Sequence, residues 1–366
     1  MFQELQQQDF EKARTVFRGF DYQVVVRSVI EGTSPGKIWV DDSVHPNAGF
    51  MATTEGWFLA GDANRIKFNE GLRQLVHDMI LKGEYYSPVN PEFLRELFFH
   101  IDSESWKKQF SFIFDIRPPL PTNRVHFTCS KVSLDWRNIL PEGYELVQVD
   151  STFDAGAFEF PEDIKEWTAH SLEEQKARGF GKCLVYGKRI VVWINADCAS
   201  SDECEIGIIT SKDSRLKGLG SATAAAAVEH CLASGFSLVG WHCEDHNIGS
   251  IRVAQKVGFV KEREYKHYIC MFDETEHFAE TGLRHFHDGK YREAVSEFEK
   301  GFTHGEVPIW AYIMAARSYG FIGNARKAKD CLVSAKKRGW SNWESVVQRK
   351  ELQSVITSSD WDEILR

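Results

Sequence analysis

The sequence predicts an α+β fold class: an α+β N-terminal domain, a second α+β domain with a sheet and flanking helices, and an all-α repeat domain at the C-terminus. Three observations lead to this prediction. Segments rich in aromatic and β-branched residues alternate with helical patterns as far as residue 272. A strand, a glycine-bearing turn and an alanine-rich helix follow one another between residues 206 and 233. From residue 276 the pattern is helical throughout and repeats after 34 residues.

The first domain is expected to span residues 1–120. Its predicted elements are, in order, a helix at 1–20, strands at 22–30, 37–40 and 49–60, helices at 69–81 and 91–99, and a segment at 106–114 that ends in a strand. The domain carries no glycine-rich phosphate loop and no metal-ligand pattern. Pro118, Pro119 and Pro121 form a stiff break, which we interpret as the domain boundary.

The second domain is expected to span residues 121–274. Its predicted elements are strands at 125–132 and 144–149, a helical region at 153–178, a hairpin of 183–186 with 190–195, a central strand at 203–210, a helix at 222–233, a strand at 237–243, a short helix after Asn247, and a strand at 265–272. This order comes from residue patterning alone.

The turn between the central strand and the alanine-rich helix indicates an anion-binding site. Gly218 and Gly220 have no Cβ, so backbone N–H groups can close on a phosphate there. The start of the following helix adds unpaired donors and a partial positive charge. The loop lacks the GKS/T ending of a P-loop and the third glycine of a dinucleotide fingerprint. A plain strand–helix turn is the alternative interpretation.

Three ordered motifs within residues 203–259 resemble those of the GNAT superfamily of acyl-CoA-dependent N-acyltransferases. Arg215-x-x-Gly218-x-Gly220 matches the superfamily's pyrophosphate loop, Q/R-x-x-G-x-G/A. A second strand follows the helix, and Asn247-x-x-Ser250 then opens a helix closing with Lys256-Val-Gly258-Phe259, similar to the N-x-x-A/S…K-x-G-F segment. The resemblance implies a GNAT-like mixed sheet with flanking helices and acetyl-CoA as cosubstrate.

The chain as a whole resembles one branch of that superfamily, in which a degenerate acyltransferase-like half precedes the functional one. The segments SVIEGTSPGKIWVDD and GFMATTEGWFLAGDANRIKFNEGL carry this resemblance. It implies that residues 1–120 form a degenerate GNAT-like domain.

The C-terminal residues 275–366 are predicted to form a tetratricopeptide-like (TPR-like) helical domain. Small and aromatic residues have the spacing of such a helix pair, namely Gly282, Gly289, Tyr291, Ala294 and Phe298. A step of 34 residues from Ala294 reaches Ala328. A third helical stretch, residues 343–365, is expected to cap the repeats. We expect this tail to offer a surface for a partner protein.

Acyl transfer needs a held cofactor and a donor for the oxyanion that develops on the thioester. The resemblance implies that the splayed end of the central strand binds the pantetheine arm and that the N–H of Ile208 or Ile209 faces the thioester carbonyl. Ordinary core packing is the alternative for these isoleucines, and helix capping is the alternative for Asn247. The cofactor-binding residues predicted in this way are Ile208, Ile209, Thr210, Arg215, Leu216, Lys217, Gly218, Leu219, Gly220, Ser221, Asn247 and Ser250.

Glu205 is the predicted general base. A lysine-like amine has a pKa of about 10.4 and must lose a proton before it attacks. Members of the superfamily that use a glutamate base carry it at about this position, ten residues before Arg215. Glu203 shares the same strand face by alternation. The alternative is that Glu205 is an ordinary glutamate at the surface or the edge of the site.

The sequence departs from the superfamily at the group that protonates the leaving thiolate. Many members have a tyrosine seven residues after the helix-opening asparagine, and here that position is Ala254. A water molecule, His242 or Tyr265 could take over the role.

Charge and composition exclude several classes of partner. The 366 residues carry a net charge of −9 and a pI near 5.8, which argues against general affinity for nucleic acid. No apolar stretch reaches membrane-spanning length, so we expect no membrane contact. The polar first residues and eight scattered cysteines predict a cytoplasmic protein with reduced thiols. Histidines 277, 285 and 287 have no ligand spacing, so no metal is expected.

The sequence thus predicts an acetyl-CoA-dependent N-acetyltransferase that moves an acetyl group directly to an amine of a small molecule. The alternative is a non-catalytic acyl-CoA-binding adaptor whose TPR-like tail binds a partner protein. The retained Glu205 and phosphate loop favour the enzyme, whereas Ala254 and the appended repeats favour the adaptor.

Overall fold

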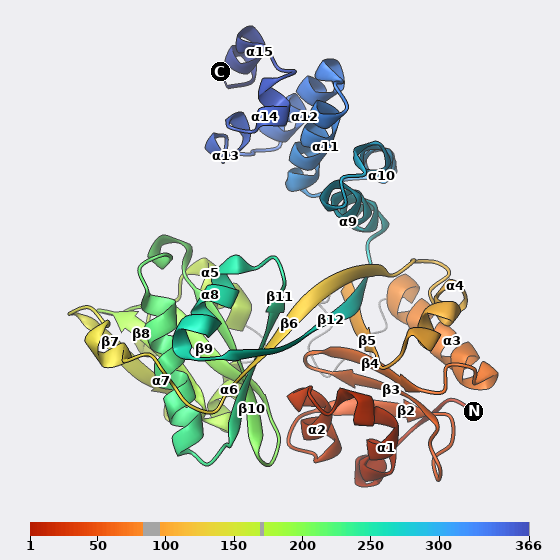
Figure 1. Cartoon of the computed structure of the whole chain (residues 1–366), viewed down its shortest axis with the longest axis vertical. Helices are drawn as coiled ribbons and strands as arrows, with labels where there is room; N and C mark the ends of the chain where they lie inside the picture. The colour runs from red at the N-terminus through yellow and green to blue at the C-terminus, as the bar shows by residue number, and fades with distance from the viewer. Residues whose placement is uncertain (83–95, 169–171, 366) are drawn as a thin grey trace. The chain divides into compact units, whose positions relative to one another are not determined.

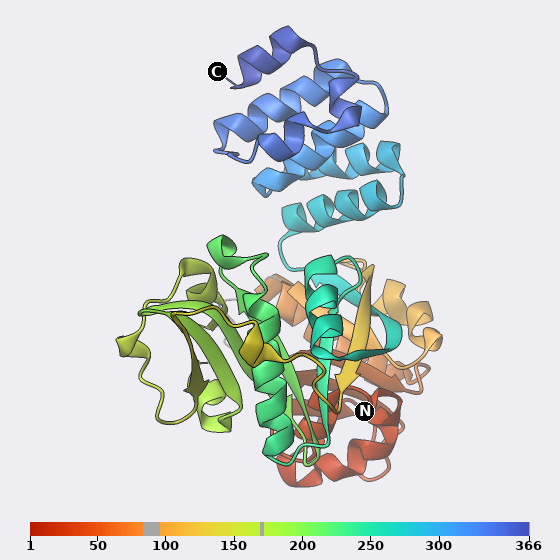
Figure 2. The same ribbon diagram turned by 60° about the vertical axis from the view of Figure 1, so that its left-hand side comes forward.

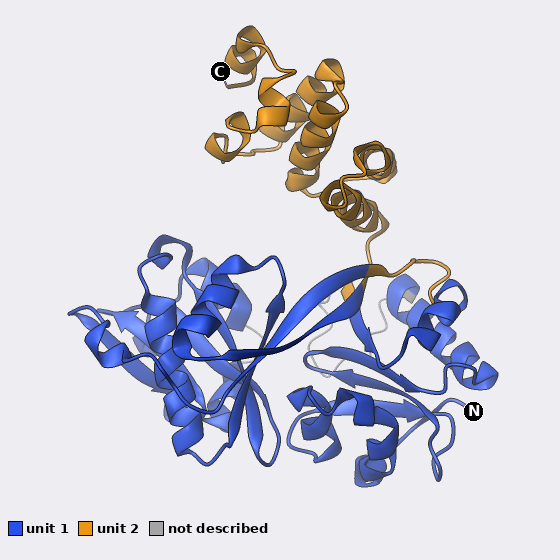
Figure 3. Ribbon diagram, viewed as in Figure 1, with its two compact units in different colours: residues 1–94, 98–113, 121–268 blue, residues 95–97, 114–120, 269–366 orange. Residues whose placement is uncertain are grey.

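A computed structural model describes residues 1–82, 96–168 and 172–365 (Figure 1). The chain forms two compact units (Figure 3). The first contains residues 1–94, 98–113 and 121–268, and the second contains residues 95–97, 114–120 and 269–366. The predicted domain boundaries at residues 120 and 274 stay a prediction.

Within the described residues, the strands join into one 12-stranded mixed sheet with the order β1-β2-β3-β4-β5-β12-β6-β11-β10-β9-β8-β7. The pairs β4–β5 and β10–β11 are parallel, while neighbours such as β3–β4 and β9–β10 are antiparallel. The strands are β1 Gln3–Glu4, β2 Gly36–Val40, β3 Ala48–Thr53, β4 Gly56–Gly61, β5 Glu96–Ile101, β6 Leu120–Cys129, β7 Tyr144–Val149, β8 Gly181–Tyr186, β9 Arg189–Ala199, β10 Glu203–Thr210, β11 Leu238–Glu244 and β12 Val260–Met271.

The helices that flank this sheet are α1 Arg14–Phe17, α2 Val24–Ile30, α3 Ile66–Lys82, α4 Phe110–Ile113, α5 Glu162–Thr168, α6 Leu172–Arg178, α7 Leu219–Ala233 and α8 Ile248–Val257. The predicted GNAT-like mixed sheet with flanking helices is therefore present, followed by a helical C-terminal region. The central strand has the predicted bounds, 203–210, and the helix, strand, helix and strand after it follow in the predicted order.

Several predictions for the N-terminal region are wrong. Residues 24–30 form the helix α2 instead of a strand, although valine occupies Val24, Val25 and Val26. All three valines are buried in one apolar cluster, and this tertiary packing outweighs their β propensity. The segment 49–60 is a hairpin, β3–β4, that turns at Thr54 and Glu55. Residues 1–20 contain β1, two short 3-10 helices and α1 in place of one helix.

Two further N-terminal predictions fail at or near β5. The predicted helix at 91–99 lies partly outside the described residues, and from Glu96 onward the chain is a strand. Leu97 and Phe99 are buried at a spacing of two, which is the period of a strand. The segment 106–114 is helical and contains no strand. Its buried Trp106 and Ile113 are seven residues apart, which is two helical turns.

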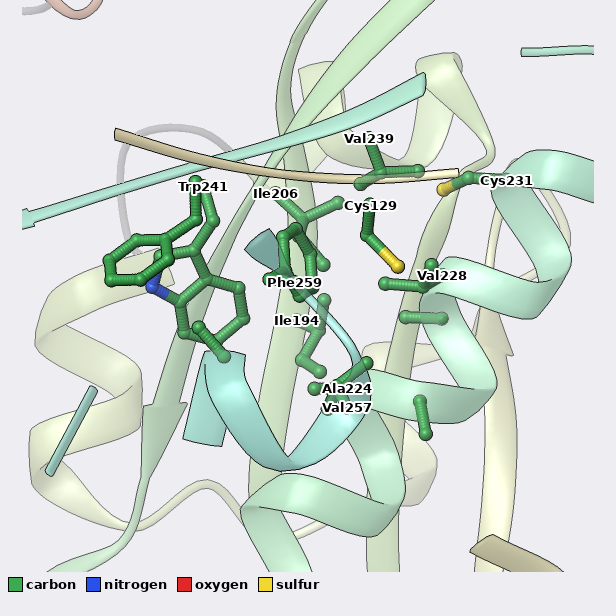
Figure 4. Close-up of a cluster of buried hydrophobic side chains, with 14 of the residues drawn as sticks. Cys129, Ile194, Ile206, Ala224, Val228, Cys231, Val239, Trp241, Val257 and Phe259 are labelled. Carbon is green, nitrogen blue, oxygen red and sulfur yellow. The ribbon is translucent and has the colours of Figure 1, made fainter. Parts of the chain in front are cut away.

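A hydrophobic core holds α7 and α8 against one face of the C-terminal part of the sheet (Figures 1 and 2). Ile194 of β9, Ile206 of β10 and Trp241 of β11 point into this cluster, where they meet Ala224 and Val228 of α7 and Val257 of α8 (Figure 4). The alanines at 224–227 are almost completely buried, so the helix lies close to the sheet. α5 packs on the opposite face, because Ile164 shares a cluster with Trp193 of β9.

The N-terminal half is tied to the hairpin between β9 and β10. Arg27 of α2 forms ion pairs with Asp202 and with Glu203. The Glu31 carboxylate accepts from the N–H of Ser201. These bonds fix α2 beside the start of β10, so the two halves of the first compact unit meet at the central strand.

The second unit contains the remaining helices: α9 Glu274–His287, α10 Tyr291–His304, α11 Ile309–Phe321, α12 Ala325–Lys337, α13 Glu344–Val347, α14 Lys350–Gln353 and α15 Ser358–Leu365. α10 and α12 begin 34 residues apart (325 − 291). A Cβ at Gly282 would lie 2.9 Å from the ring of Phe298, so these helices touch at a small residue. The TPR-like assignment itself stays a prediction. None of the helices among the described residues could span a membrane.

Candidate active site

β10 and β11 form a fork. They pair in parallel only from Glu203 to Glu205, which face Leu238 to Gly240. Beyond this point β10 continues beside β9, and β11 continues beside β6. The separated edges leave backbone N–H and C=O groups without a strand partner, as the sequence predicted for the end of the central strand.

The direction of the N–H groups on β10 distinguishes Ile208 from Ile209. The N–H of Ser211 donates to the carbonyl of Val191 on β9. Because alternate residues of a strand turn their N–H groups to the same side, Ile209 also faces β9. The N–H of Ile208 therefore points to the open edge of the fork, and Ile208 is the better placed of the two predicted donors.

The phosphate-loop segment leads into an uncapped helix. Gly218 has a φ of +79° and stands at the N-cap of α7, where no side chain caps the helix and no acidic residue occupies the first turn. Gly220 is needed for a close approach, since a Cβ there would lie 3.0 Å from Oγ1 of Thr210. The start of α7 thus offers free donors and positive potential next to the end of β10.

A cavity of about 500 Å³ lies over this helix start and the end of β10. Eleven of the twelve predicted cofactor-binding residues line it: Ile208, Ile209, Thr210, Arg215, Leu216, Gly218, Leu219, Gly220, Ser221, Asn247 and Ser250. Lys217 does not line the cavity, because its Nζ donates to the carbonyl of Asp213. Sequence reasoning missed Ser214, Gly249, Arg252, Val253 and Lys256, which complete the lining. The helical spacing of Arg252 and Lys256, four residues apart, could have indicated a basic wall.

Asn247 caps α8, as the alternative interpretation proposed. Its Oδ1 accepts from the N–H of Ser250 at 3.1 Å, and the Ser250 hydroxyl accepts from Nε1 of Trp241 at 2.9 Å. Both residues also line the cavity, so the capping role leaves room for contact with a ligand.

Glu205 lies at the vertex of the fork, since its pairing with Gly240 is the last between the two strands. Its neighbours Cys204 and Ile206 belong to the core under α7, so the Glu205 side chain faces the opposite side of the sheet. The residue is only 6% exposed. Burial, with a smaller contribution from the charge of Glu55, raises the pKa of Glu205 to about 8, while Arg124 opposes this shift.

Glu205 contacts His242, and His242 in turn contacts Tyr265. Nε2 of His242 is 3.5 Å from Oε2 of Glu205, and Nδ1 of His242 is 2.7 Å from the Tyr265 hydroxyl. Burial lowers the pKa of His242 well below its usual value, so the imidazole is neutral at physiological pH. The ring of His126 stacks on that of His242 at 4.2 Å and holds its orientation.

A β-bulge next to Glu205 places further polar groups on the same face. β9 pairs Cys198 with Glu205 and Ala196 with Ile206, which leaves Asp197 as the extra residue. The Nδ2 of Asn195 donates to Asp197, and Nη1 of Arg178 donates to the backbone carbonyls of Ala196 and Asp197. Sequence reasoning missed these residues. A signal was present, because Asn195 and Asp197 interrupt the otherwise apolar strand RIVVWINADCA.

Residues 14–268 match the family model described as GNAT acetyltransferase, which covers more than half of the chain. The chain belongs to this family. This GNAT acetyltransferase is 26% identical over 274 residues to the uncharacterised N-acetyltransferase YdfB of Bacillus subtilis, covering 73% of this chain and 98% of that protein. It is similar to a GCN5-related N-acetyltransferase-like protein of Streptococcus suis, with 20% identity, a TM-score of 0.46, and coverage of 72% and 99% of the two chains. It is also similar to a GCN5-related N-acetyltransferase of Sphaerobacter thermophilus, with 12% identity, a TM-score of 0.49, and coverage of 74% of this chain and 95% of that chain.

The structure also shows the surroundings of Glu203 and Ala254, two residues that the sequence analysis considered for catalysis. Glu203 is bound by Arg27 of α2 in a 2.5 Å ion pair, so it is less available as a base than Glu205. Ala254 is completely buried in the core beneath the sheet. Among residues 1–82, 96–168 and 172–365, no group of three histidine, cysteine or acidic side chains is placed to hold a metal ion.

Proposed function

We propose that this GNAT acetyltransferase transfers an acetyl group directly from acetyl-CoA to the amine of a small molecule, with Glu205 as the general base. The position of Glu205 carries the proposal. It is the last residue of β10 paired with β11, so its carboxyl group lies where the fork opens.

The cofactor side of the proposal rests on the cavity over α7. The uncapped helix start at Gly218 would bind the pyrophosphate, and Arg252 and Lys256 would add positive charge to the same wall. The open edge of β10 would pair with the pantetheine arm. There the N–H of Ile208 would stabilise the negative charge that develops on the thioester oxygen. Acetyl-CoA supplies the activated acetyl group.

The base must accept a proton from an ammonium group with a pKa of about 10.4. A carboxylate of ordinary pKa is a weak acceptor for this proton, whereas the pKa of about 8 at Glu205 brings it closer to the amine. Burial therefore makes Glu205 a better base at mildly alkaline pH. The carboxylate would take the proton directly or through one water molecule.

His242 is the candidate for passing this proton onward. It is neutral, touches Glu205 with Nε2 and touches Tyr265 with Nδ1. Nε2 would accept the proton that Glu205 has taken from the amine, while Nδ1 passes its own hydrogen to the Tyr265 oxygen. Burial raises the pKa of Tyr265, so its hydroxyl is protonated and has a hydrogen to donate. We propose that Tyr265 protonates the thiolate as it receives the hydrogen from His242, so that His242 ends the step neutral.

The release of free CoA thiol from acetyl-CoA, with a panel of small amines, tests the proposal. We expect amine-dependent release that tracks formation of the acetylated amine in the same samples. The alternative of a non-catalytic acyl-CoA-binding adaptor predicts cofactor binding without amine-dependent release. That result would refute the proposed reaction.

The helices of the second unit have no role in the proposed reaction. We propose that α9 to α12 bind a partner protein, as the TPR-like pattern predicts, and that the protein acts in the cytoplasm. A pull-down with the isolated helical region as competitor would test the first point, since competition requires that the helices carry the binding surface.

A further inference from the structure

The face of the sheet that carries Glu205 holds more acidic groups than the proposed reaction uses. Asp197 projects over Gly207, because a Cβ at Gly207 would lie only 2.5 Å from Oδ2 of Asp197. Glu205 and Gly207 are alternate residues of β10, so this second carboxyl group lies roughly 7 Å along the strand from the base. The missing side chain at Gly207 leaves room for it.

A third carboxyl group comes from the N-terminal half. Glu55 lies in the β3–β4 turn, next to Gly56, whose Cβ would meet the ring of Phe98 at 2.4 Å. That ring is 6.0 Å from the ring of His267 on the C-terminal half of the sheet. The charge of Glu55 acts on both Glu205 and Asp197, and it raises the pKa of each. The turn therefore brings its carboxyl group to the same face.

Two arginine charges act on these three carboxyl groups. Among the described residues, Glu55 and Asp197 form no ion pair, and the contact of Glu205 is with the neutral His242. The charge of Arg124 lowers the pKa of Glu55 and Glu205, and that of Arg178 lowers the pKa of Glu55 and Asp197. Burial and the repulsion between the carboxyl groups outweigh these charges, so the pKa of Asp197 is well above its usual value. A bound cation would favour the ionised carboxylates.

One unpartnered polar atom at the same face points independently to a ligand. Oδ1 of Asn195 has no hydrogen-bond partner although Asn195 is only 4% exposed, and its amide already contacts Asp197 through Nδ2. A buried acceptor without a partner is unfavourable unless a ligand engages it.

We propose that the acceptor is a diamine, whose reacting nitrogen lies at Glu205 and whose second, cationic nitrogen is held by Asp197 and Asn195, with Glu55 completing the site. This inference rests on the proposed function, because it names the acceptor class for that reaction. The second ammonium group would donate to the Asp197 carboxylate and to Oδ1 of Asn195. Glu55 gives the N-terminal half a direct role in selecting the acceptor.

Titration calorimetry on the full chain at pH 8, with diaminobutane and with butylamine, tests the proposal. We expect the diamine to bind at least about tenfold more tightly, since one charge-assisted contact of 1.4 kcal/mol corresponds to that factor. Binding of the diamine should also release protons, because its charge lowers the raised pKa of Glu205 and Asp197. Two buffers that differ in heat of ionisation measure this release.

Two variants locate the second nitrogen. Asp197→Asn should bring the diamine-to-monoamine affinity ratio close to one and reduce the proton release. Glu145→Gln, which removes a carboxylate on the exposed part of β7, should leave the ratio unchanged. Equal affinities for the two amines in the wild type would overturn the proposal, and this comparison needs no variant. A ratio that Asp197→Asn leaves intact would overturn it equally.

Thiol release in the same samples separates this inference from the reaction itself. A chain that acetylates butylamine as well as diaminobutane, and binds both equally, would retain the proposed function and refute the diamine site. A chain that binds diaminobutane preferentially but releases no thiol would retain the diamine site and refute acetyl transfer.

Discussion

The two sides of the β10–β11 fork are built in opposite ways. The cavity over α7 is lined by the end of β10, by residues of the segment 214–221 other than Lys217, and by α8, and its proposed contacts to the cofactor are made mainly by backbone groups. The face around Glu205 is formed by buried titratable side chains from separate strands, such as Asp197, His242 and Tyr265. The first side depends on main-chain geometry, whereas the second depends on individual functional groups. Side-chain substitutions on the Glu205 face should therefore change turnover without changing the affinity for acetyl-CoA, and substitutions at the cavity should change that affinity.

The largest expected effect is at the vertex of the fork. Glu205→Gln keeps the shape of the side chain and removes its basicity, so turnover at pH 8 should fall by about 10²–10⁴-fold while the affinity for acetyl-CoA stays unchanged. Steady-state assays of thiol release and titration calorimetry measure the two quantities. Glu203→Gln is the control, because Glu203 is bound by Arg27. A larger loss with Glu203→Gln than with Glu205→Gln would assign the base to Glu203.

Eleven of the twelve residues that the sequence predicts to bind the cofactor line one cavity, on the first side of the fork. Arg215, Gly218 and Gly220 lie within six residues of the chain. The local structure of a strand, a turn and a helix is therefore enough to place them near one another. The bounds of β10 were also predictable, because its β-branched run is framed by polar residues. Lys217 is the predicted residue that does not line the cavity, since a local pattern does not show which way an exposed lysine turns.

On the second side, the sequence indicated Glu205, His242 and Tyr265 as candidates but gave no sign of the other groups. Glu55, Asn195 and Asp197 are brought together by a β-bulge and by the order of strands in a sheet that joins both halves of the chain. Residues that are brought together by long-range strand pairing have no fixed separation along the chain, so a sequence pattern does not identify them. The same limit explains α2, where burial of Val24 to Val26 in the N-terminal cluster outweighed a strand-like composition.

The next effect concerns the cofactor side alone. Gly220→Leu would press a side chain against Thr210 and shift α7 away from β10, so the affinity for acetyl-CoA should fall by about tenfold or more. Lys217→Ala is the matched control in the same loop, because Lys217 lies outside the cavity, and its affinity should stay at the wild-type value. Equal affinities for wild type and Gly220→Leu in calorimetry would refute the loop as the cofactor site.

A smaller effect is expected on α8. Arg252→Ala removes a positive charge from the cavity wall, so the affinity for acetyl-CoA should fall by about three- to tenfold at low salt and by less at high salt. Gln255→Ala alters an exposed residue of the same helix that does not line the cavity, and it should have no effect. A loss with Arg252→Ala that does not depend on salt would contradict a charge contact.

The smallest effect on binding is expected from the tail. Removal of residues 276–366 takes away most of the C-terminal helical region but no residue that lines the cavity or the Glu205 face. The affinity of the remaining soluble protein for acetyl-CoA should stay within about twofold of that of the full chain. A folded, tail-less protein that cannot bind acetyl-CoA would show that the C-terminal helices complete the site.

The pH dependence of kcat/KM in the wild type, relative to Glu205→Gln, tests the assignment of Glu205 as the base most directly. At pH 6, two units below a pKa of about 8, only about 1% of Glu205 is ionised, so the advantage of the wild type should be small. The ratio should rise through pH 8 as the carboxylate forms, and fall again above about pH 10 as free amine forms unaided. A ratio that is constant from pH 6 to pH 10 would contradict a base that titrates at the vertex of the fork.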